Sequence, residues 1–94
     1  MPGNGRREKF VSPAGLVLAG AYLGLTVGEI RRLAEERGLP LLEVEYELYV
    51  LERQGNIEVR DGRLSIPPTA HRLTRSLAEK AARSINVVPA DNSV

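Results

Sequence analysis

The sequence predicts a mainly α-helical domain with one small antiparallel β-hairpin, which is an α+β fold. Its 94 residues, 43% hydrophobic and 27% charged, suffice for one domain with a modest core. Four segments begin with residues that favour helix starts and continue with apolar side chains at helical spacing. Asp61 and Gly62 separate two short runs in which apolar and polar residues alternate, as in a hairpin.

The first predicted helix begins at Pro13. Ser12 has a side chain that can accept from the free amides of the first turn, and Pro13 suits the first helical position because it has no amide hydrogen. The helix is apolar nearly all round until Gly24 ends it, so we expect it to be buried on most sides. Residues 1–11 are predicted to form a basic, flexible N-terminal arm. A secretory signal is the alternative, but the uncharged run from 11 to 25 is too short to span a bilayer as a helix.

A second helix is predicted from Thr26, because Thr26 and Glu29 have the spacing of a capping box. It runs for about eleven residues, and Gly38 supplies its left-handed stop. Its core face holds Val27, Ile30, Leu33 and Ala34.

The third helix is predicted over residues 41–54, with Val44, Leu48 and Leu51 on its core face. The hairpin follows it, and two prolines close the second strand.

A last helix is predicted from about Ala70 to Ile85, capped by Thr69. Its expected apolar stripe is Ala70, Leu73, Leu77, Ala81 and Ile85, and its remaining face is basic. Either the helix packs on its own domain or a twin subunit, with its arginines meeting the glutamates of the third helix, or it binds phosphates. Residues 86–94 are predicted to be a frayed tail.

The composition argues against several classes of protein. The chain has no cysteine and one histidine, His71, so it lacks the residues for disulfides, cysteine nucleophiles and paired zinc histidines. We therefore expect no catalytic residues, no metal, no cofactor and no membrane partner, and a cytoplasmic protein. His71 is assigned no role beyond the surface.

Several residues together resemble the helix-turn-helix and wing of the winged-helix superfamily, over about residues 13–66. The residues that resemble it are Ala34, Gly38, Val44, Leu48, Leu51, Gly55, Ile57, Val59, Asp61, Gly62 and Leu64. The resemblance implies a winged-helix domain at 12–66 with an additional C-terminal helix at 69–85 for packing or dimerisation. The superfamily includes DNA-binding regulators and protein-interaction modules, so the resemblance selects neither function.

The first functional expectation is a small transcriptional regulator that binds double-stranded DNA, with a possible homodimer through the first and last helices. In the superfamily the third helix enters the major groove. Its outer face here is Leu42, Tyr46, Tyr49 and Arg53, so Arg53 is the one good base reader. Four glutamates border that face, which is unfavourable beside phosphates. The predicted DNA contacts are Arg6, Arg7, Lys9, Arg31, Arg32, Arg53, Arg60 and Arg63.

The second expectation is a protein-interaction module. Here Leu42, Tyr46, Tyr49 and Val50, rimmed by glutamate, receive a basic amphipathic helix from a protein partner. A structural alternative is that these side chains are extra core beneath another part of the chain, and the last helix is the obvious cover. We expect such cover over free exposure.

Overall fold

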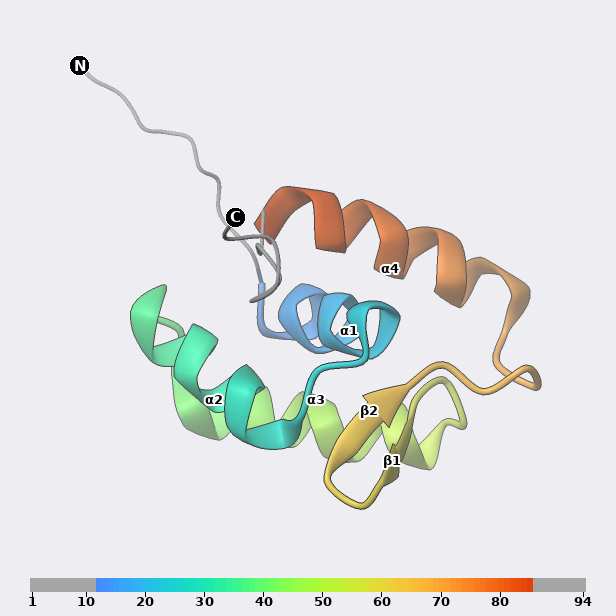
Figure 1. Cartoon of the computed structure of the whole chain (residues 1–94), viewed down its shortest axis with the longest axis horizontal. Helices are drawn as coiled ribbons and strands as arrows, with labels where there is room; N and C mark the ends of the chain where they lie inside the picture. The colour runs from blue at the N-terminus through green and yellow to red at the C-terminus, as the bar shows by residue number, and fades with distance from the viewer. Residues whose placement is uncertain (1–11, 86–94) are drawn as a thin grey trace, which may run out of the picture.

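The computed structural model of the chain describes residues 12–85 (Figure 1). Its elements are α1 (Pro13–Leu23), α2 (Val27–Glu36), α3 (Leu41–Arg53), β1 (Glu58–Arg60), β2 (Arg63–Ser65) and α4 (Arg72–Ile85). The two strands pair in one antiparallel sheet. The predicted mainly helical α+β class is therefore confirmed, whereas the predicted arm at 1–11 and tail at 86–94 lie outside the described residues.

The ends of α1 and α2 follow the capping signals of the sequence. The Ser12 hydroxyl accepts from the amide of Gly15 at 3.0 Å, and Gly24 ends α1 with a φ of 75°. The Thr26 hydroxyl accepts from the Glu29 amide at 3.1 Å, while the Glu29 carboxylate accepts from the Thr26 amide at 2.9 Å. This reciprocal pair is the predicted capping box.

The hairpin turns at the predicted dipeptide. Asp61 and Gly62 have φ angles of 54° and 77°, so both central residues adopt the left-handed conformation of a two-residue hairpin turn. Two backbone hydrogen bonds tie the hairpin to the start of α2: the Val27 amide donates to Gly62 and the Leu64 amide to Leu25, each at 2.8 Å. The hairpin is thus fixed beside the helices.

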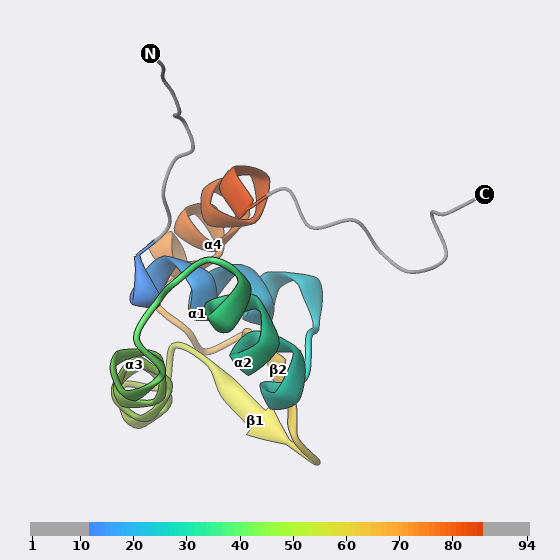
Figure 2. The same cartoon turned by 90° about the vertical axis from the view of Figure 1, so that its left-hand side faces the viewer.

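The core surrounds α1, which contacts α2, α3, α4 and β2. Its fully buried side chains include Leu16, Val17, Ile30, Ala34, Val44 and Leu64. Ala34 and Val44 are thus buried, on the predicted core faces of α2 and α3. Both views place α1 between α4 on one side and α3 on the other (Figures 1 and 2).

The prediction for the last helix was wrong in its start and in part of its buried face: Ile85 is buried and Ala70 and Ala81 pack against the core as predicted, but Leu73 and Leu77 do not. The helix begins at Arg72, so Thr69 does not cap it; instead His71 Nδ1 accepts from the Leu73 amide at 3.1 Å. The buried residues of α4 are Thr74, Ala78 and Ile85, whereas Leu73 and Leu77 are each 55% exposed.

The reason for the second error is that α4 carries two stripes at helical spacing. The stripe that contains Thr74 and Ala78 has small side chains, and this stripe packs along α1. The two leucines of the other stripe remain at the surface.

Candidate functional site

The candidate site is the outer face of α3, which carries three large exposed side chains in a row. Leu42 is 82% exposed, Tyr46 63% and Tyr49 58%, and Val50 beside them is half-buried. Val44, Leu48 and Leu51 hold the opposite face of α3 in the core. We call Leu42, Tyr46, Tyr49 and Arg53 the α3 strip, since their spacing of four, three and four residues places them along one line of the helix.

The expected cover over this strip was wrong. The packing partner of α4 is α1, on the far side of the molecule from α3 (Figure 2). Within one chain, the expected contact between α4 arginines and α3 glutamates was wrong for the same reason, whereas the alternative of a contact with a twin subunit stays a prediction. Among the described residues, Arg83 instead pairs with Glu79 on its own helix at 2.8 Å, and Arg75 donates to the carbonyl of Ile66 at 3.3 Å. The α3 strip is therefore open to a partner.

Carboxylates border the α3 strip on both sides. Glu43 and Glu52 are exposed, and Glu47 and Glu45 are half-buried. Glu45 accepts from Arg31 Nε on α2 at 2.6 Å, and this hydrogen bond raises the pKa of the Arg31 guanidinium. Within residues 12–85, Glu43, Glu47 and Glu52 form no ion pair, so they add negative charge beside the apolar side chains.

Arg53 lies against Tyr49 instead of projecting freely. Its guanidinium carbon is 5.7 Å from the centre of the Tyr49 ring, and it donates to the Tyr49 hydroxyl at 3.2 Å. This is cation–π geometry, which holds both side chains in place at one end of the strip.

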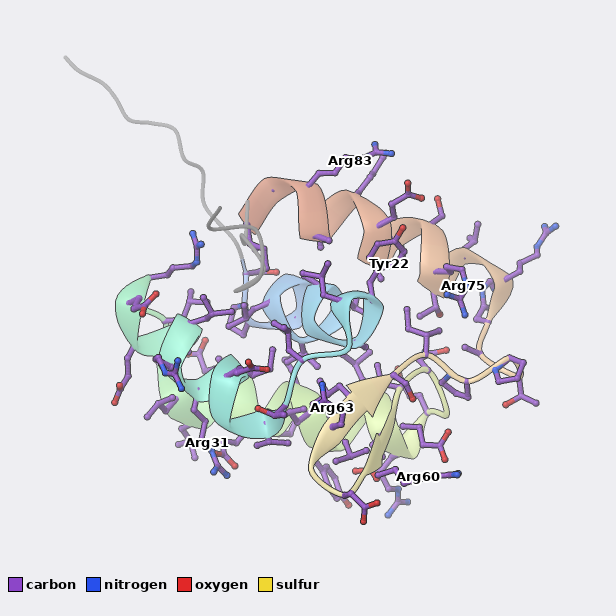
Figure 3. The ribbon with its side chains drawn as sticks, in the orientation of Figure 1. Tyr22, Arg31, Arg60, Arg63, Arg75 and Arg83 are labelled. Atoms are coloured by element: carbon purple, nitrogen blue, oxygen red, sulfur yellow. The ribbon has the colours of Figure 1, made fainter. Side chains whose placement is uncertain are left out.

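The other described arginines predicted to contact DNA also have partners, apart from Arg32. Arg31 pairs with Glu45, and Arg60 pairs with Glu58. Arg63 donates to the carbonyl of Gly24 at 2.5 Å, and Arg32 is exposed on α2. Figure 3 shows Arg31 and Arg60 at separate places, one on α2 and one on the hairpin. The remaining predicted contacts, Arg6, Arg7 and Lys9, lie outside the described residues.

Arg60 and Arg63 do share one feature. Together with Asp61, Leu64 and Ser65 they line an open hollow at the hairpin. Two guanidinium groups can attract a phosphate there, although Asp61 in the same hollow opposes it.

Within residues 12–85 no group of histidine, cysteine or acidic side chains has the arrangement to hold a metal ion. In the same part of the chain no helix combines the length and apolar character needed to cross a membrane. Comparison with family models, curated proteins and solved structures gives no match.

Sequence reasoning missed the exposed face of α4. Leu73 and Leu77 were assigned to the core, although Thr74 and Ala78 offered a competing stripe one residue further on. The sequence of α1 does not separate the two stripes, because α1 has no charged residue and accepts small and large apolar neighbours alike.

Proposed function

We propose that this chain is a winged-helix interaction module whose α3 strip binds a basic amphipathic helix of a protein partner. The observation that carries the proposal is the exposure of Leu42, Tyr46 and Tyr49 in one line, bordered by carboxylates. Apolar side chains at such spacing can pack against the apolar side of a partner helix. The order of three helices and a hairpin supports the superfamily assignment, as do the positive φ of Gly38 after α2 and the Asp61-Gly62 turn.

The chemistry of the strip fits protein better than DNA. Tyrosines supply much of the binding energy at protein interfaces, and removal of a central one commonly costs about 2 kcal/mol or more. Glu43, Glu47 and Glu52 attract basic side chains, which speeds association and selects the partner. Against DNA the same carboxylates would face phosphates, and only Arg53, already stacked on Tyr49, lies on the strip to offset them.

A designed peptide tests the proposal directly. The probe is a fluorescent amphipathic helix with leucine at i, i+4, i+7 and i+11 and lysine at its other exposed positions, titrated by anisotropy. We expect binding that weakens at least about tenfold in the Tyr46→Ala/Tyr49→Ala variant. Because both tyrosines are exposed, the variant should melt close to the parent protein.

Two controls separate specific binding from general attraction. A peptide with glutamate in place of lysine should not bind. Glu43→Lys/Glu47→Lys should abolish binding of the lysine peptide, whereas Glu35→Lys/Glu36→Lys, an equal charge change on exposed residues of α2, should reduce it far less. Equal losses in these two variants, or no binding at low salt, would reject the α3 strip as the site.

Double-stranded DNA is the second candidate partner, in the role of a small transcriptional regulator. The observation that favours it is the hollow at the hairpin with Arg60 and Arg63. Neutralising several phosphates demands a steep fall of affinity with salt. A titration of labelled duplex across salt concentrations therefore separates the two functions. Steep salt dependence that Arg60→Ala/Arg63→Ala flattens would favour DNA.

A further inference from the structure

The outer face of α4 carries a second exposed strip with the same spacing as the α3 strip. Leu73, Leu77, Lys80 and Ser84 follow one another at four, three and four residues, and all four are exposed. We call them the α4 strip. Thr74, Ala78 and Ile85 hold the neighbouring face of this helix against α1. Two exposed leucines one turn apart are the apolar element of an amphipathic helix.

The two helices carry opposite charge of equal size. On α3, four glutamates and one arginine give a net charge of −3; on α4, three arginines, one lysine and one glutamate give +3. Arg72 and Lys80 form no ion pair with another residue in the described range 12–85. The α4 strip therefore matches the partner chemistry that the α3 strip requires, which is a basic amphipathic helix.

The two strips cannot meet within one chain. Both views show α1 between α4 and α3, so the helices lie on opposite sides of the molecule (Figures 1 and 2). The arginines of α4 accordingly bind groups other than those of α3: Arg83 pairs with Glu79 on its own helix, and Arg75 donates to the carbonyl of Ile66. Arg31 on α2 pairs with Glu45. Contact between the strips requires two molecules.

We propose that the α4 strip of one copy docks on the α3 strip of a second copy. This inference rests on the proposed function of the α3 strip and names its partner. The contact joins two different surfaces, so the first copy keeps its α3 strip free and the second copy keeps its α4 strip free, and the assembly grows as an open chain or closes as a ring. A symmetric contact of α4 on α4 is disfavoured, because it would bring two helices of net charge +3 together.

The contact is expected to be weak. A contact of one helix face on each side buries less surface than the about 800 Å² per partner that is typical of stable complexes. The mass in solution should therefore rise with protein concentration from the monomer value of 10.3 kDa and fall back when salt is added.

Complementation between two variants tests the inference. The first, Tyr46→Ala/Tyr49→Ala, lacks the α3 strip; the second, Leu73→Glu/Leu77→Glu, lacks the α4 strip and repels the glutamates of α3. Each alone should remain a monomer in light scattering at concentrations where the parent chain assembles. An equimolar mixture retains one intact pair of strips, so it should form a heterodimer of twice the monomer mass and nothing larger. This rescue is also the control that both variants are folded.

Three other outcomes would overturn the inference. If the first variant assembles by itself while the second variant by itself stays monomeric, the protein forms a symmetric dimer through α1 and α4. Failure of the equimolar mixture to pair would show that the strips do not contact each other. A parent chain that stays monomeric at every concentration would also refute it. If that monomer still binds the leucine and lysine peptide through Tyr46 and Tyr49, the proposed function stands without this partner; if it does not, both fail.

Discussion

Gly20 is the position where the packing of α1 against α2 makes the sharpest stability prediction. A Cβ atom at this residue would overlap Cδ1 of Ile30, lie 3.1 Å from Cγ1 of the same side chain and 3.7 Å from Leu64. Ile30 is fully buried, so it has little room to move aside. Gly20→Ala therefore sets a helix-propensity gain of up to about 1 kcal/mol against an overpacking cost of about 1–3 kcal/mol.

We expect the overpacking cost to exceed the gain, so that Gly20→Ala lowers the free energy of unfolding by about 1 to 2 kcal/mol. For a domain of this size each kcal/mol corresponds to about 4–8 °C in melting temperature. The assay is urea and thermal denaturation followed by circular dichroism. Gly28→Ala is the matched control, because its nearest atom is 3.9 Å away, and it should be neutral or slightly stabilising.

A double-mutant cycle isolates the cause. Ile30→Val removes Cδ1 and by itself should cost about 0.5–1.5 kcal/mol. In the Ile30→Val background Gly20→Ala should cost clearly less than in the parent protein, because the overlapping atom is gone. Equal costs in both backgrounds, or a Gly20→Ala variant more stable than the parent, would refute the close approach of α1 to α2 at this point.

Two further predictions concern side-chain hydrogen bonds at the starts of α2 and α4. The hydrogen bond from the Thr26 amide lowers the pKa of the Glu29 carboxyl below its ordinary value of 4.5, so the stability it supplies is present above that pH and is lost as the pH falls through the lowered pKa. Glu29→Gln should therefore be less stable than the parent at neutral pH, with the difference shrinking in acid; a difference independent of pH in denaturant titrations would contradict this. The Asn56 side-chain oxygen accepts from the buried Thr74 hydroxyl at 3.0 Å and from the His71 amide at 3.2 Å. Asn56→Ala should cost about 1–2 kcal/mol and speed hydrogen exchange at the start of α4, and it should cost less in the Thr74→Val background, where no hydroxyl loses its acceptor.

Local chemistry made the helix ends and the hairpin predictable. Ser12, the Thr26 and Glu29 pair, and Asp61-Gly62 each act on neighbours a few residues away, so their effects are readable from the sequence. The core face of α3 was predictable for a related reason. Its apolar residues at helical spacing leave a polar flank on either side, which fixes the buried direction.

The packing of α4 was not predictable in this way. Both of its stripes have helical spacing, and α1 from Pro13 to Leu23 carries no charge that would select between them. Partners of individual arginines were equally hidden, because Arg63 reaches Gly24 and Arg31 reaches Glu45 only after the chain folds. Arg31 and Arg63, which were assigned to DNA on charge, are thus engaged by contacts that spacing does not encode.

The charges around the exposed tyrosines of α3 bear on how the domain avoids non-specific association. A small domain that left Leu42, Tyr46 and Tyr49 uncovered without a partner would risk non-specific association, because neighbouring exposed apolar side chains attract one another. The flanking carboxylates reduce that risk, since two α3 helices of net charge −3 repel each other. Two α4 helices repel for the opposite reason, and α1 keeps the two kinds apart within a chain. Among the three pairings of the described α3 and α4 surfaces between copies, only the unlike pair combines apolar burial with charge attraction, so the charges that keep like surfaces apart also select the proposed partner.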